Sequence, residues 1–180
     1  LGTLWARAGH AVTFAYARSA AKLARLAGAC GGRAGSIAEA VAGADAVLLA
    51  VHWSRVPEVL AEAGDLDGQV VISCCIPLDD SDSRLVVGLT SSGAEELARM
   101  RPRARLACAF STTPSESFAP VFARKGEPRP PHVMIYGDDA GAKDTAFALA
   151  RDAGFEPQET GGLRNARFVE PFAMATVELA

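Results

Sequence analysis

Two almost uninterrupted apolar runs constrain the fold of this chain most strongly. Residues 44–51 have the sequence ADAVLLAV, and residues 69–76 have the sequence QVVISCCI. Runs of this kind are typical of strands that are buried on both faces, as in a parallel sheet with a helix layer on each side. We therefore expect an α/β fold, Rossmann-like and doubly wound, with helices on both faces of a mostly parallel sheet.

The segments around these two runs alternate between strand and helix patterns. We expect further strands at residues 11–16, 104–110, 132–137 and 156–160, and helices at 1–8, 19–28, 36–42, 54–63, 93–101, 140–153 and 163–180. Residues 79–92 favour a loop, and residues 111–131 favour a short helix followed by a loop. No repeat or flexible linker divides the chain, so residues 1–180 are predicted to form a single domain with a C-terminal helical segment at about 163–180.

Composition excludes several classes of function. The 180 residues are 49% hydrophobic and carry a net charge of −3, which argues against broad binding to nucleic acid or to an anionic membrane. No apolar run approaches the roughly 20 residues that span a bilayer. The four cysteines lack metal-ligand spacing, and we interpret them as reduced residues of a cytoplasmic protein without a metal site; they are Cys30, Cys74, Cys75 and Cys108.

The first helix pattern begins at the start of the sequence, with no strand before it. In doubly wound folds that bind dinucleotides, a strand and a glycine-rich G-x-G-x-x-G turn precede this helix. The pairs Gly31-Gly32 and Gly161-Gly162 do not link a strong strand to a long helix. We therefore expect an N-terminally truncated chain that binds a dinucleotide poorly. The alternative is a fold that never had this strand and turn.

Four segments carry a resemblance to a known family. They are LWARAGHAVTFAYARSAAKL, AVHWSRVPEVL, VVISCCIPL and GDDAGAKDTAFALARDAGFEP together with GGLRNARFVEPFAM. They resemble the NADP-dependent oxidoreductases that act with the deazaflavin coenzyme F-420, over the whole chain and most specifically in its C-terminal portion. The sequence departs from the family pattern at His52, where proline is usual, and at Ile76, where asparagine is usual. Because related domains occur in ferric and cupric reductases, the resemblance implies fold and cofactor better than substrate.

Arg18, Ser19 and Lys22 stand at the end of the second strand of such a fold. A carboxylate at this position accepts hydrogen bonds from the ribose of NAD, whereas an arginine accommodates the 2′-phosphate of NADP. Lys22 lies one helical turn beyond Arg18, and Ser19 would stand at the helix N-terminus, which also favours an anion. We predict that these three residues bind the 2′-phosphate. The alternative is that Arg18 and Lys22 are ordinary solvated surface charges.

The remaining cofactor contacts are expected at the carboxyl ends of the other strands, where open α/β sheets bind ligands. The candidates in these loops are Val51, His52, Trp53, Arg55, Ile76, Pro77 and Thr112. His52 is equally consistent with a structural or solvent-exposed histidine. No nucleophile–base pair and no proton donor stand out, and Asp79-Asp80 and Asp138-Asp139 are interpreted as turn or helix-capping residues.

The last helix pattern carries two further groups. Arg164, Asn165 and Arg167 precede an apolar stretch, where they could bind an anionic substrate, or cap the helix and pair with acidic neighbours such as Glu170. The apolar residues of this helix favour core packing or a dimer interface; they include Phe168, Phe172, Met174, Val177 and Leu179.

The function expected from the sequence is hydride transfer between NADP(H) and a deazaflavin coenzyme of the F-420 type, with the two cofactors supplying the chemistry and the protein their alignment. The alternatives are an NADPH-dependent reductase of another small-molecule acceptor, such as a flavin, a ferric or cupric ion or a carbonyl compound, and an NADP-binding module without turnover. A homodimer is the one protein partner that we expect.

Overall fold

Two separate sheets form the scaffold of this computed structural model, which describes residues 1–16 and 19–177. The smaller sheet pairs β1 (Thr13–Phe14) with β2 (Arg33–Ala34). The larger sheet has the order β3-β4-β5-β6-β7, and its strands are β3 (Val47–Leu49), β4 (Val70–Ser73), β5 (Arg105–Ala109), β6 (His132–Tyr136) and β7 (Glu156–Glu159). Its strands are parallel except at the β5–β6 pair, which is antiparallel.

Helices connect the strands, and several of them begin at capping side chains. The helices are α1 (Gly2–Arg7), α2 (Ala20–Gly28), α3 (Ile37–Val41), α4 (Val56–Ala63), α5 (Gly93–Met100), α6 (Phe118–Ala123), α7 (Ala140–Asp152) and α8 (Ala166–Val177), with short 3₁₀ turns η1 (Trp53–Arg55), η2 (Ser115–Ser117) and η3 (Leu163–Asn165). Ser36 and Glu39 form the capping box expected for α3. Asp139 caps α7, and Ser19 and Ser92 cap α2 and α5.

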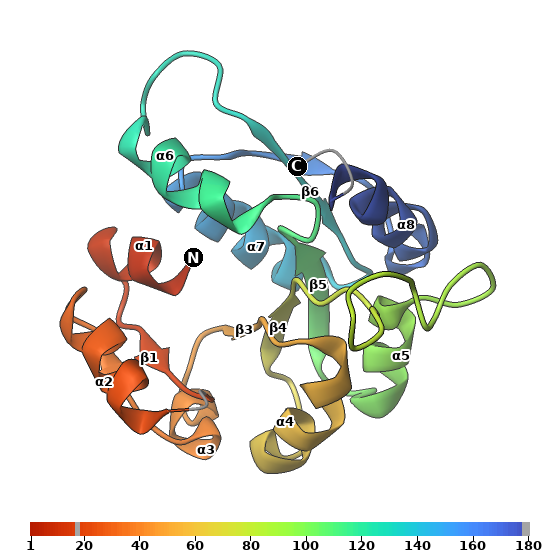
Figure 1. The fold of residues 1–180 in the computed structure, drawn as a ribbon, viewed down its shortest axis with the longest axis horizontal. Helices are drawn as coiled ribbons and strands as arrows, with labels where there is room; N and C mark the ends of the chain where they lie inside the picture. The colour runs from red at the N-terminus through yellow and green to blue at the C-terminus, as the bar shows by residue number, and fades with distance from the viewer. Residues whose placement is uncertain (17–18, 178–180) are drawn as a thin grey trace.

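The five-stranded sheet is covered on both faces (Figure 1). Alternate β4 residues point to opposite sides, so Ile72 packs with α1 and α7 while Val71 packs with α3, α4 and α5. A third cluster joins α5 and α8 over β5 and β6, and it includes Cys108 and Tyr136. The expected α/β fold with a mostly parallel sheet and helices on both faces is confirmed.

The structure differs from the sequence-based expectation in two elements. The Arg33–Ala34 strand was not expected, because both residues are exposed, glycines flank them and the strand is only 2 residues long. Helix α8 buries Ala166, Val169 and Ala173, whereas Phe168 and Phe172 are 64% and 50% exposed. The interpretation of these two phenylalanines as core residues is therefore wrong, since the small residues of α8 face the sheet. The side chain of Val177, and Leu179, lie outside the described residues.

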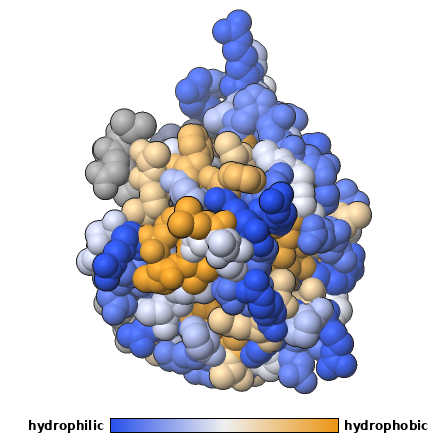
Figure 2. Space-filling view, turned by 90° about the vertical axis from the view of Figure 1, so that its right-hand side faces the viewer, coloured by the Kyte–Doolittle hydropathy of each residue, from blue (hydrophilic) through white to orange (hydrophobic). Residues whose placement is uncertain are grey.

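Apolar side chains also appear on the molecular surface (Figure 2). Among the described residues, the large exposed apolar ones include Val86, Leu89, Phe168 and Phe172. Within the same described part of the chain, no helix is long and apolar enough to cross a membrane.

Candidate functional site

The N-terminus of α2 is the first part of the candidate site. Ser19 is extended, with φ −144° and ψ 118°, and its hydroxyl oxygen accepts a hydrogen bond of 3.3 Å from the Lys22 N–H. The first turn of α2 contains no acidic residue, and both Ser19 and Lys22 are exposed. An exposed helix N-terminus with a hydroxyl and a cation is suited to hold an anion. Arg18, the third residue predicted here, lies outside the described residues.

The carboxyl ends of β3 and β4 bring together most of the other predicted residues. The Cys75 thiol donates a hydrogen bond of 3.1 Å to the Val51 carbonyl, which joins the chain after β4 to the chain after β3. Pro77 is buried, and its carbonyl accepts a hydrogen bond of 2.7 Å from the Val86 N–H. Ile76 is half-buried beside it. Burial raises the pKa of the Cys75 thiol, so this sulfur is a structural donor and not a reactive thiolate at neutral pH.

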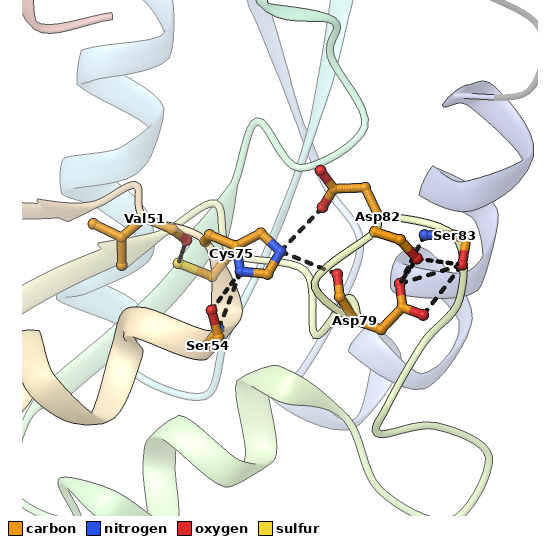
Figure 3. Close-up of polar contacts among 8 residues, drawn as sticks. Val51, Ser54, Cys75, Asp79, Asp82 and Ser83 are labelled. Carbon is orange, nitrogen blue, oxygen red and sulfur yellow. Dashed lines mark hydrogen bonds and ion pairs between the residues drawn. The ribbon is translucent and has the colours of Figure 1, made fainter. Parts of the chain in front are cut away.

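Both ring nitrogens of His52 are occupied by groups of this chain (Figure 3). Nδ1 accepts from the Ser54 N–H at 3.2 Å and lies 2.9 Å from the Ser54 hydroxyl. Nε2 therefore carries the proton and donates to the Asp79 carbonyl at 3.2 Å and the Asp82 carboxylate at 3.1 Å. Of the two interpretations of His52, the geometry favours the structural one: the ring ties the turn at residues 79–84 to the start of η1.

The turn held by His52 is itself organised around Asp79. The Asp79 carboxylate accepts hydrogen bonds from the Ser83 N–H at 2.8 Å and from the hydroxyls of Ser81 and Ser83, and it pairs with Arg84. The Ser83 N–H bond and these hydroxyls lower the pKa of Asp79 to about 2. The turn role expected for Asp79 is confirmed. Asp139, from the second acidic pair, is the N-cap of α7, and the Asp138 carboxylate accepts from the Leu163 N–H at 2.9 Å.

Two further predicted residues, Arg55 and Thr112, lie at this edge. Arg55 is exposed and lies 3.4 Å from the Glu58 carboxylate one turn along α4. Thr112 is half-buried, between Ser111 and Thr113 in the loop after β5. The side chains of Ser111 and Thr113 line a groove of about 470 Å³, together with Leu48 and Ala50 of the β3 edge and Cys74. Sequence reasoning named Thr112 at this position, whereas the structure places its two neighbours in the groove.

The start of α5 adjoins the same strand ends, and sequence reasoning did not include it in the site. A Cβ atom built on Gly93 would lie 2.9 Å from Pro77 and 3.2 Å from the Trp53 ring, so the helix N-terminus is in close contact with both residues. The carboxylate of Glu170, from α8, accepts from the Gly93 N–H at 2.8 Å and the Ala94 N–H at 3.0 Å. Helical spacing from Ala166, Val169 and Ala173 places Glu170 on the buried side of α8, which is the signal in the sequence that could have identified it.

The polar residues before α8 serve the helix packing. Arg167 donates two hydrogen bonds to Glu95 of α5, at 2.8 and 2.6 Å, so its acidic partner is Glu95 and the expected pairing with Glu170 is wrong. Asn165 donates to the Thr160 carbonyl at 2.5 Å, while Arg164 is exposed. Of the two interpretations of this segment, capping and pairing is the one that the contacts favour.

Comparison with known proteins bears on the N-terminal part of the chain. Residues 1–77 match the family model described as NADP oxidoreductase, coenzyme F420-dependent. The range ends at Pro77 and includes every predicted site residue except Thr112. The resemblance inferred from the sequence covers the whole chain, whereas this match covers less than half of it. Residues 1–77 are thus similar to the class expected from the sequence, the NADP-dependent oxidoreductases.

The individual relatives share less than 30% sequence identity with this chain. The chain is 28% identical over 134 residues to the metalloreductase STEAP3 of Rattus norvegicus, an alignment that spans 73% of this chain and 25% of the length of that protein. A crystal structure of a candidate F420-dependent NADP reductase from Arthrobacter sp. FB24 is similar at a TM-score of 0.83 and 22% identity, over 98% of this chain and 87% of that one. A reductive aminase of Aspergillus terreus, in complex with NADPH and ethyl levulinate, is similar at a TM-score of 0.66 and 17% identity, over 98% of this chain and 56% of that one. At these identities the two structures show that the fold is shared.

Proposed function

We propose that this chain forms a single NADP(H)-binding unit of an oxidoreductase that transfers hydride between NADP(H) and a deazaflavin coenzyme of the F-420 type. The observation that carries the proposal is that the family-model match contains both parts of the site. These are the exposed start of α2 and the strand-end residues from Val51 to Pro77. The bound dinucleotide would supply the hydride, and the protein would supply orientation and exclusion of water.

The described residues fit such a cofactor at two places. The start of α2 presents the Ser19 hydroxyl and the Lys22 side chain without a nearby first-turn carboxylate, which suits the 2′-phosphate. Arg18 would add a guanidinium to the same helix end. At the strand ends, Val51, Trp53, Ile76 and Pro77 offer apolar contacts, and Arg55 and Thr112 offer donors to ribose or phosphate oxygens.

A different acceptor is the second candidate. The relatives include a metalloreductase and a reductive aminase, so a ferric or cupric ion or a small carbonyl or imine compound is the alternative substrate, beside a flavin. An NADP-binding module without turnover is the third candidate. All three share the cofactor site; the first two differ in the acceptor, and the third transfers no hydride.

Parallel assays on the full chain test these candidates. NADPH is mixed with the deazaflavin, with a flavin, with ferric or cupric ions, or with a cyclic imine, and the absorbance of NADPH is followed. The proposal predicts that NADPH is oxidised fastest with the deazaflavin, whose own visible absorbance falls in step. If NADPH is oxidised only with another acceptor, that acceptor is the substrate and the deazaflavin is not. If NADPH binds and no acceptor oxidises it, the chain is an NADP-binding module without turnover.

We also propose a homodimer that buries the exposed phenylalanines of α8. Phe168 and Phe172 lie one helical turn apart and are both at least half exposed. Sedimentation analysis of the wild type and of Phe168→Asp tests this: dissociation of the dimer by the substitution is expected, and a monomeric wild type would contradict it.

A further inference from the structure

We propose that Glu170 is a positioning residue for the cofactor site, because its carboxylate fixes the start of α5 against Trp53 and Pro77. The inference rests on the proposed function for its link to NADP(H). The contacts that carry it belong to a part of the fold that lies outside the family-model match, since Glu170 and α5 both follow residue 77.

Two hydrogen bonds from the backbone of α5 to the Glu170 carboxylate join α8 to α5, and we call this pair of bonds the clamp. The Glu170 side chain is almost fully buried, with 1% of the residue exposed, and each of its oxygens accepts one backbone N–H from the first turn of α5. These N–H groups have no partner within the helix, so a buried acceptor is needed to satisfy them. A buried carboxylate otherwise costs free energy, and the two charge-assisted hydrogen bonds and the helix dipole compensate that cost here.

The second step is the contact between α5 and the strand ends. Gly93, whose N–H is bound by Glu170, has no room for a side chain on the side of Pro77 and Trp53. A shift of the N-terminus of α5 would therefore change the positions of Pro77 and Trp53. Both belong to the predicted cofactor site, and Trp53 is the first residue of the η1 turn, which His52 caps.

The third step is that the clamp responds to pH near neutrality. Burial raises the pKa of Glu170 to about 7, despite the two N–H groups that act in the opposite direction. The groups that face it are Glu95 from α5, Cys75 after β4, Cys108 from β5 and Tyr136 from β6. Burial raises the pKa of the two thiols and the phenol, so these three groups stay neutral, while the Glu95 carboxylate is paired with Arg167.

Ionised Glu170 can accept both N–H groups fully, whereas the protonated acid has one strong acceptor oxygen. The start of α5, and with it Trp53 and Pro77, should therefore be held most firmly above the pKa of Glu170. Loss of one charge-assisted hydrogen bond corresponds to a change of about tenfold in an equilibrium that depends on this arrangement.

The experiment follows the backbone amides of Gly93 and Ala94 and the indole N–H of Trp53 by NMR between pH 5.5 and pH 8.5, without cofactor. In the wild type, we expect all three signals to titrate together near neutral pH. In Glu170→Gln the transition should vanish, and in the matched control Glu95→Gln it should persist. A Trp53 signal that does not follow the amides, or an unchanged transition in Glu170→Gln, would overturn the proposal.

A second measurement connects the clamp to binding. The dissociation constant of NADPH is expected to fall by about tenfold across the same pH range in the wild type, beyond any change in Glu170→Gln. An identical pH profile in the two proteins would overturn the link to the cofactor. If no variant binds NADPH while the NMR transition is intact, the proposed function fails and the clamp on Trp53 is supported.

Discussion

Helices α2 and α5 begin in the same way and differ in what lies at their N-termini. Each is capped by a serine whose hydroxyl oxygen accepts from the backbone N–H three residues on, Ser19 in α2 and Ser92 in α5. At α5, Ser92 is fully buried and Glu170 satisfies the next two N–H groups. At α2, Ser19 and Lys22 are exposed, and no acidic side chain stands in the first turn.

This difference indicates that a serine-capped helix N-terminus can serve either packing within the protein or the binding of a ligand. The positive end of a helix attracts a negative group, and that group can come from the protein or from a ligand. In α5 the chain supplies its own carboxylate and gains a fixed contact between α5 and α8. In α2 the chain supplies the Lys22 cation and leaves Ser19 and Lys22 exposed, which is the arrangement expected for a phosphate site.

The largest expected effect concerns the start of α2. Replacing both Arg18 and Lys22 by alanine should weaken NADPH binding by about 100-fold, because two charge-assisted contacts to the 2′-phosphate are lost at about tenfold each. NADH, which lacks this phosphate, should bind almost as before. Titration of both nucleotides into wild type and variant measures the effect. Equal losses for NADPH and NADH would refute the assignment of α2.

The next largest effect concerns the start of α5. Glu170→Ala leaves two buried N–H groups without their acceptor and should lower the free energy of unfolding by about 2–3 kcal/mol. Urea unfolding measures the loss. Ser19→Ala, at the exposed end of α2, is the comparison and should cost about 1 kcal/mol. If the two substitutions lower the free energy of unfolding equally, the hydrogen bonds to Glu170 do not stabilise the start of α5 as proposed.

A substitution at Gly93 sharpens the comparison without changing charge. Gly93→Ala places a methyl group 2.9 Å from Pro77 and 3.2 Å from Trp53, and overpacking of this size costs about 1–2 kcal/mol. We expect lower thermal stability and a changed Trp53 environment. The control is the reverse change, Ala21→Gly, at an exposed position of α2. It should lower the stability of that helix and leave the Trp53 signal unchanged. An unchanged Trp53 signal in Gly93→Ala would show that α5 does not press on the strand ends.

The raised pKa of Glu170 also predicts that folding stability depends on pH. Because the folded-state pKa of Glu170 is raised above the usual value of 4.5 to about 7, its protonated form is favoured by folding. Its contribution to the free energy of unfolding is therefore fully present below about pH 4.5 and is lost as the pH rises through about 7, although the ionised carboxylate makes the stronger local hydrogen bonds to Gly93 and Ala94. The free energy of unfolding is measured for the wild type and for Glu170→Gln from pH 4.5 to pH 8. Between pH 4.5 and about 7 it should fall more steeply with pH in the wild type than in the variant, and above about 7 the two slopes should be equal. Parallel curves throughout would contradict the raised pKa.

Sequence reasoning predicted the fold well where its signals are local. The apolar runs at 44–51 and 69–76 became β3 and β4, and the Ser36–Glu39 box began α3 where expected. It failed where tertiary context decides. β6 pairs antiparallel with β5, and nothing in the HVMIY segment encodes that direction.

The positions of the strand-end residues were predicted for the same reason, whereas their role in binding a cofactor stays a prediction. Strand ends are visible in a sequence, so Val51, Trp53 and Pro77 were placed correctly at one edge of the sheet. Side-chain partners are not visible, so His52 was left between two interpretations until its contacts with Ser54 and Asp82 were known. Glu170 was missed as a site residue because its two acceptor bonds join positions 76 and 77 residues apart.

The most direct test of the account is a comparison of adenosine 2′,5′-bisphosphate with adenosine 5′-monophosphate, each titrated into the full chain and followed by the backbone amides of Ser19–Lys22 and of Gly93 and Ala94. If the start of α2 binds the 2′-phosphate, the bisphosphate should shift the α2 amides and bind at least tenfold more tightly than the monophosphate, while the α5 amides shift little. Equal affinities, or shifts that are larger at α5 than at α2, would contradict it.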